Sequence, residues 1–159
     1  MQTLNSPLEL GVRALIVLTA AFPRPLDLNR LVLMDYCLLH SADLSGPPSV
    51  LPELPTRVGE LGVKRAVLDH GVQLMVRAGM VDLVTTGDAI AYRASEQAAP
   101  FLRLVASPLM DSLTRVADWA VAEFADREDE EVRARMQEVA DRWTEEFVSN
   151  APGDGGLGL

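Results

Sequence analysis

Apolar residues recur with a helical period along most of the chain, and the polar residues between them carry helix-start signals. Ser6-Pro7 followed by Glu9 predicts the beginning of a first helix, because Ser6 can accept a hydrogen bond from a free backbone N–H and proline suits the first helical position. The apolar residues of this helix stop before Pro23. Asp27 can begin a second helix that is apolar nearly all round, which predicts a central place in the core.

A long helix followed by a hairpin is predicted for residues 57–93. The residues after Arg57 roughly follow a helical period, and Gly79 can end the helix because glycine adopts the left-handed conformation without strain. Two short apolar runs then flank a turn at Gly87, which is typical of two paired strands. A helix that runs into a hairpin is the core of a winged helix, so residues 1–94 are predicted to form a winged-helix-like domain.

Further helices are predicted after the hairpin. Ser95 can begin a short helix to about Ala106, and Ser107-Pro108 repeats the start signal of the first helix, for a helix to about Phe124. The predicted buried stripe of this second helix consists of Leu109, Leu113, Val116, Ala120 and Phe124. The overall prediction is therefore a mainly α fold with one small β-hairpin and a C-terminal helical extension.

The last predicted helix, near residues 128–148, has a narrow apolar stripe between acidic flanks. Its members recur at spacings of three and four residues and are Val132, Met136, Val139, Trp143 and Phe147. An exposed stripe of this kind commonly marks an interface, so these residues are predicted to bind a partner. The alternative is that the stripe folds back on its own subunit. Residues 95–149 are predicted as C-terminal helices, and residues 150–159 as a flexible tail.

The acidity of the chain is concentrated in this last helix. The formal net charge is -9 over 159 residues. Residues 1–125 hold 13 acidic and 10 basic side chains, whereas residues 126–149 hold 9 acidic and 4 basic ones. An acidic helix repels nucleic acid and suits a basic protein surface, although a solvated face would explain the same composition. A DNA-binding protein, in contrast, needs cations to displace the counterions of phosphate.

The cysteine content and the apolar runs indicate the cellular compartment of the protein. Cys37 is the only cysteine, so no internal disulfide can form. The apolar run from Leu15 to Phe22 is too short to span a bilayer, which takes about 20 residues. We therefore expect a soluble cytoplasmic protein that does not contact a membrane.

Catalytic and metal-binding signatures are sparse. Gly59-Glu60-Leu61-Gly62 follows no predicted strand, so it does not resemble a nucleotide-binding loop. Cys37 and His40 could share a metal, but a structural zinc site needs four ligands and His70 is the only other histidine.

Two other polar groupings near His40 have equally simple explanations. Ser41, His40 and Asp43 are neighbours in sequence, which does not by itself make a catalytic triad. Asp35 and Asp43 could bind magnesium together with Glu60, but helix capping and hydrogen bonding explain them as well. No catalytic residue, metal or cofactor is therefore predicted, and the chain is not expected to be an enzyme.

Five cations gather on the winged-helix segment and could follow a phosphate backbone if they share a face. They are Arg57, Lys64, Arg65, Arg77 and Arg93. Acidic neighbours dilute this patch, so ion pairs at the surface are an equal alternative.

Three runs of sequence together resemble a known family. They are Asn5 to Arg13, Asp35 to Ser41, and Pro55 to Leu61. These runs resemble the small middle component of bacterial ABC-three component systems, the group that includes Lamassu-type anti-phage defence. The resemblance covers about residues 4–125, so the last helix and the tail lie outside it.

The resemblance implies two protein partners: a large SMC/Rad50-like ATPase with coiled-coil arms, and an effector that is often a nuclease. The middle component would be a non-catalytic adaptor that bridges them and meets DNA only indirectly. A homodimer fits this view, because winged-helix subunits commonly attach to such ATPases as dimers. Arg57 and Glu60, where a proline-rich loop meets the long helix, are expected to bind a partner together with the apolar stripe.

Two other functions compete with the adaptor. A winged-helix DNA-binding transcription regulator should carry a basic recognition face, whereas this chain has 14 cationic against 23 acidic residues. A small metal-dependent nuclease would respond to metal titration.

Overall fold

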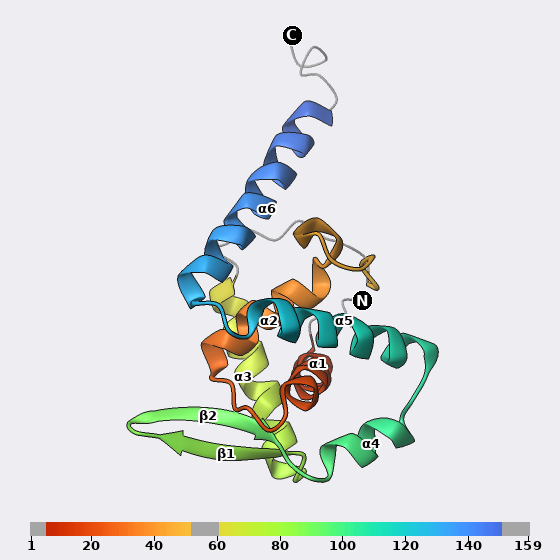
Figure 1. Cartoon of the computed structure of the whole chain (residues 1–159), viewed down its shortest axis with the longest axis vertical. Helices are drawn as coiled ribbons and strands as arrows, with labels where there is room; N and C mark the ends of the chain where they lie inside the picture. Colours follow the sequence, from red (N-terminus) through yellow and green to blue (C-terminus); the bar gives the residue numbers. More distant parts are fainter. Residues whose placement is uncertain (1–5, 52–60, 151–159) are drawn as a thin grey trace.

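The chain folds into helices with one small antiparallel hairpin (Figure 1). The computed structural model describes residues 6–51 and 61–150, except for the side chains of residues 61–62 and 143–150. In chain order the elements are α1 (Pro7–Ala21), α2 (Leu28–Leu39), the 3-10 helix η2 (Ala42–Leu44), α3 (Leu61–Arg77), β1 (Val81–Thr86), β2 (Ala89–Ala94), α4 (Ala98–Leu104), α5 (Pro108–Phe124) and α6 (Asp129–Asn150). The predicted mainly α fold with one hairpin and a C-terminal helix is confirmed.

Three of the predicted helix starts are formed by the predicted side chains. The Oγ of Ser6 and the Oδ1 of Asp27 each accept a hydrogen bond from the backbone N–H three residues later, at 3.2 and 2.7 Å. Ser107 Oγ does the same at 3.2 Å at the beginning of α5. Each of these oxygens satisfies a backbone donor that has no partner within its helix.

Gly79 ends α3 in the way that the sequence predicts. Its φ is 81°, in the region that side chains with a Cβ rarely adopt. The N–H of Met80 donates to the Met75 carbonyl, and the N–H of Gly79 donates to the Val76 carbonyl, each at 3.0 Å. These two bonds are the pair that closes a Schellman motif. They turn the chain directly from α3 into β1.

The hairpin is joined at its base to a third extended residue. β1 and β2 pair from Val81 opposite Ala94 to Thr86 opposite Ala89. On the far side of β2, Leu26 and Tyr92 exchange both of their backbone hydrogen bonds, each at 2.8 Å. The segment between α1 and α2 therefore extends the small sheet by one residue, a pairing that the sequence analysis does not predict.

Helix α1 is the centre of the core and packs against α2, α3, α4, α5 and β2. Its closest neighbour is α3, where two glycines meet. A Cβ added to Gly11 would lie 2.6 Å from the Gly71 carbonyl oxygen, and one added to Gly71 would lie 2.2 Å from the Pro7 carbonyl oxygen. The two backbones can approach this closely only because both positions lack a side chain.

Two local predictions are wrong. Ser95 does not begin a helix; α4 begins at Ala98, and the Ser95 hydroxyl donates to the Gly79 carbonyl at 2.6 Å, so it supports the turn after α3. Leu109 is 48% exposed and does not belong to the buried stripe of α5, which consists of Leu113, Val116, Ala117, Ala120 and Phe124.

The two parts predicted at residues 1–94 and 95–149 share a core. Helix α5 packs against both α1 and α2, and α6 packs against α2 before it extends away from the other helices (Figure 1). The division into two domains stays a prediction, and residues 151–159 of the predicted tail lie outside the described residues. None of the described helices combines the length and the apolar character that crossing a membrane requires.

Candidate partner-binding surface

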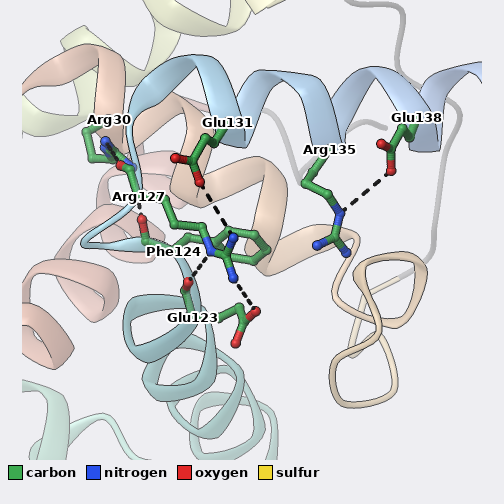
Figure 2. A network of polar contacts seen from close by, with 7 residues as sticks. All are labelled: Arg30, Glu123, Phe124, Arg127, Glu131, Arg135 and Glu138. Carbon is green, nitrogen blue, oxygen red and sulfur yellow. Dashed lines mark hydrogen bonds and ion pairs between the residues drawn. The ribbon is translucent and has the colours of Figure 1, made fainter.

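The α5–α6 corner is held by Arg30, which projects from α2. Its guanidinium donates to the Phe124 carbonyl at 3.0 Å and to the Arg127 carbonyl (Figure 2). It also pairs with the carboxylate of Asp129 at 2.7 Å. Carbonyls at a helix end lack partners within the helix, so Arg30 satisfies the end of α5 and neutralises the first residue of α6. This arginine therefore sets where α6 leaves the body of the protein.

A second arginine lies on the outer side of the same corner. Arg127 pairs with Glu123 of α5 at 3.2 Å and with Glu131 of α6 at 3.6 Å, and its guanidinium carbon lies 5.9 Å from the centre of the Phe124 ring (Figure 2). These side chains are partly exposed, and exposed ion pairs of this type stabilise a protein only slightly. Their main effect is to leave a surface of mixed charge at the corner.

The predicted apolar stripe of α6 divides into a described and an undescribed part. Val132, Met136 and Val139 are all buried within the chain's own core. For these three residues the structure therefore agrees with the alternative prediction, in which the stripe packs on its own subunit. They form no exposed apolar patch for a partner. Trp143 and Phe147 lie in α6 as predicted, but their side chains lie outside the described residues. Their role in partner binding stays a prediction.

The 3-10 helix η2 docks on the same face of α6. Arg142 donates to the Asp43 carbonyl at 2.6 Å, and Arg135 donates to the Leu44 carbonyl at 3.3 Å. An open cleft of about 640 Å³ lies beside these contacts. Its walls include three carboxylates and two guanidiniums, so it favours neither an anionic nor a cationic small molecule. Its lining residues are Asp43, Ser45, Arg135, Glu138, Asp141 and Arg142.

The outer face of α6 is exposed and mainly acidic. The exposed charged side chains of α6, up to the last described one, are Glu130, Glu131, Arg133, Glu138, Asp141 and Arg142, of which the last three also line the cleft beside η2. This composition is complementary to a surface rich in lysine and arginine.

A buried carboxylate joins α1, α2 and α3. Asp35 on α2 accepts hydrogen bonds from Arg13 on α1, at 2.8 and 3.2 Å, and pairs with Lys64 on α3 at 2.7 Å. Burial alone would raise the pKa of Asp35, but the charges of Lys64 and Arg13 and their hydrogen bonds outweigh this effect and lower the pKa to about 2. Asp35 is thus committed to a structural cluster, and Asp43 does not share it.

The polar groupings near His40 do not form a nucleophile with its base. His40 is buried and stacks on Tyr36, with ring centres 4.3 Å apart. Its Nδ1 lies 3.7 Å from the nearest Asp43 oxygen, beyond hydrogen-bond distance, and the Ser41 hydroxyl makes no hydrogen bond within the described residues. Burial raises the pKa of Cys37 to about 12, which keeps the thiol protonated. Among the described residues, no group of three or more His, Cys, Asp or Glu side chains could hold a metal.

The predicted cationic patch is not continuous. Lys64 forms an ion pair with the buried Asp35, and Arg65 donates a hydrogen bond to the Asn29 side chain at 2.9 Å. Arg57 and Glu60, both predicted to bind a partner, lie outside the described residues. Of the five cations, Arg77 and Arg93 form no hydrogen bond or ion pair with another side chain in the described part of the chain.

Comparison with known proteins gives one match. A family model described as ABC-three component (ABC-3C) system Middle Component 2 matches residues 3–146. Neither the curated proteins nor the solved structures include a match to the chain.

The lowered pKa of Asp35 makes stability depend on pH. Its ordinary pKa is 3.8, and its pKa in the folded chain is about 2. The ionised carboxylate therefore stabilises the folded chain by about 2 kcal/mol above pH 4. This stabilisation is lost as the pH falls from 4 to 2. Asp35→Asn leaves Arg13 and Lys64 without a counter-charge and should destabilise the chain at pH 7 by about 3–5 kcal/mol. In urea unfolding curves measured at several pH values, the free energy of unfolding of Asp35→Asn should also fall less between pH 4 and pH 2 than that of the wild type.

Asp118→Asn is the control for this measurement, because Asp118 is exposed on α5 and its replacement should change stability by less than about 0.5 kcal/mol. If Asp35→Asn and the wild type lost stability in parallel between pH 4 and 2, the pKa of Asp35 would not be lowered in the folded chain.

The burial of Met136 predicts that α6 stabilises the isolated chain. Met136→Ala should lower the free energy of unfolding by about 2–5 kcal/mol, because it leaves a cavity between α6 and the core. Arg133→Ala, on the exposed face of the same helix, is the matched control and should change stability by less than about 0.5 kcal/mol. Equal melting temperatures for Met136→Ala and the wild type would mean that α6 is not docked on the body in solution.

Proposed function

We propose that this chain, which belongs to the middle component 2 family of ABC-three component systems, is a non-catalytic adaptor in a Lamassu-like anti-phage defence complex. In this proposal it links an SMC/Rad50-like ATPase to a nuclease-type effector in the cytoplasm. The observation that carries the proposal is the family match over residues 3–146, because a middle component acts within a system of several proteins.

Two features of the surface support a role in binding proteins. The outer face of α6 is acidic, which suits a basic protein surface and opposes nucleic acid. Helix α6 also extends away from the other helices, so a partner can approach it from several sides (Figure 1). An adaptor with two partners needs separate surfaces for them, and α6 lies far from the hairpin in Figure 1.

The contacts of the buried polar residues Asp35, His40 and Ser41 support a non-catalytic role. The buried carboxylate of Asp35 is already paired with two cations, and the Ser41 hydroxyl makes no hydrogen bond to His40 or to any other described residue. A hydrolase needs a nucleophile within hydrogen-bond distance of its base. The described clusters instead fix helices to one another.

A winged-helix transcription regulator is the second candidate, and one observation favours it. The order of α1, the paired Leu26, α2, α3 and the hairpin is the order of elements in a winged helix. The charge of the equivalent DNA-facing surface gives this function little support, because Lys64 of α3 is paired with the buried Asp35, and Asp69 on α3 and Asp88 in the hairpin turn dilute the remaining cations.

The adaptor proposal is tested by leaving out one component at a time. When the three components of the system are produced together, the effector should copurify with a tagged ATPase only if this chain is present. Without this chain the effector should fall to the background of an untagged control, because the two partners would share no contact. Full recovery of the effector in the absence of this chain would contradict a bridging role.

The regulator alternative is tested by DNA binding of the isolated chain. We expect weak binding that falls steeply as salt rises, because few cations are available to release counterions from the phosphates. Fluorescence anisotropy with labelled duplex DNA at low and at physiological salt measures this directly. Sequence-specific binding that survives physiological salt would favour the regulator.

A further inference from the structure

The hairpin has one closed and one open edge. On the outer side of β2, Leu26 forms hydrogen bonds with both the N–H and the C=O of Tyr92. In an antiparallel pair, a residue whose N–H and C=O point outward lies opposite another residue whose groups also point outward. Leu83 is opposite Tyr92, and Thr85 lies two residues further along β1, so the N–H and C=O of both point to the free side of β1.

This free side is exposed and unpaired. Leu83 and Thr85 are both exposed, and neither makes a hydrogen bond on that side within the described part of the chain. They therefore offer two donors and two acceptors in the spacing of a β-ladder. Such an edge is a template for another strand, and proteins commonly protect it with lysine, proline or a bulge. In β1 none of these devices is present.

The side chains beside this edge are more apolar than a free hairpin needs. Leu83 is 49% and Ile90 is 54% exposed. The register places Ile90 opposite Thr85, and Leu83 and Thr85 are two residues apart, so Leu83 and Ile90 project from the same face of the hairpin. A strand added beside β1 would contact Leu83 on this face, whereas Ile90 lies on β2, one strand further from the open edge.

Charge indicates the kind of occupant. The hairpin from Val81 to Ala94 holds two carboxylates, Asp82 and Asp88, and one cation, Arg93, which lies opposite Asp82 on β2; the edge strand β1 itself holds Asp82 and neither lysine nor arginine. A second copy of the same hairpin would add two more carboxylates, and duplex DNA would add phosphates. An extended segment with apolar residues on one face and lysine or arginine beside them would instead be complementary.

We propose that the open edge of β1 binds such a segment of another component of the system by adding it as a third full strand of the sheet. The proposal rests on the proposed function, since it assigns one of the adaptor's surfaces. The backbone hydrogen bonds of Leu83 and Thr85 would supply the attachment, and the exposed side chain of Leu83 would select an apolar side chain on the added strand.

Two proline variants of one cross-strand pair test the proposal. Thr85→Pro removes an outward N–H on the open edge, whereas Ile90→Pro removes the outward N–H opposite it on β2; neither donor belongs to the hairpin's own ladder. The full chain is produced together with the other two components, and the amount that copurifies with the tagged chain is measured. We expect Thr85→Pro to lower the recovery of one component at least tenfold, and Ile90→Pro to change it less than threefold.

Hydrogen exchange in the purified wild-type complex gives a second readout that does not depend on folding of the variants. The amides of Leu83 and Thr85 should exchange at least tenfold more slowly in the complex than in the free chain. If the wild-type complex assembles but these amides exchange equally fast, the edge proposal is wrong and the adaptor function stands. If the wild-type components do not assemble, both are wrong.

Two other results would assign the edge to a different occupant and overturn the proposal. One is a dimer of the isolated chain, seen by analytical ultracentrifugation, that Thr85→Pro dissociates. The other is slowed exchange of Leu83 and Thr85 on addition of duplex DNA alone.

Discussion

The buried carboxylate of Asp35 is the constraint on which the arrangement of the helices depends. An isolated charge in a protein core costs several kcal/mol, so Asp35 requires cations at fixed positions. Arg13 and Lys64 supply them from α1 and α3, within hydrogen-bond distance. Because each cation lies on a different helix, the cluster fixes how α1 and α3 meet α2. The close crossing of α1 and α3 at Gly11 and Gly71 then has one register.

The rest of the molecule is positioned from this three-helix centre. The end of α3 leads through Gly79 into the hairpin, and Leu26 ties β2 to the segment between α1 and α2. Arg30, on the same helix as Asp35, fixes the corner where α5 passes into α6. The two surfaces that we assign to partners, the outer face of α6 and the edge of β1, are therefore both held by contacts that begin on or beside α2.

Local signals in the sequence predicted most of the helix boundaries. A cap such as Ser6 or Asp27 acts within a few residues, and Gly79 and Gly87 are required by the turns in which they lie, so neighbouring residues suffice to find them. The sequence could not show that Ser95 would serve the turn at Gly79, because that contact depends on how the hairpin closes.

Contacts between distant residues account for what the sequence did not predict. The sequence alone allows Asp35 to be a magnesium ligand, whereas its partners in the fold, Arg13 and Lys64, are 22 and 29 residues away in the chain. Periodicity identifies the apolar stripe of α6, but it does not show whether a helix packs on its own chain or on another, and in the fold Val132, Met136 and Val139 pack on their own chain. The open edge of β1 also required a structure, because it depends on the pairing of Leu26 with Tyr92.

As the proposed adaptor, this chain binds two other proteins and joins them. A cryo-electron microscopy map of the assembled three-component complex would show this arrangement. We expect the chain to lie between the ATPase and the effector and to contact both. A map in which the ATPase and the effector contact each other directly, with this chain attached to only one of them, would rule out the bridging role.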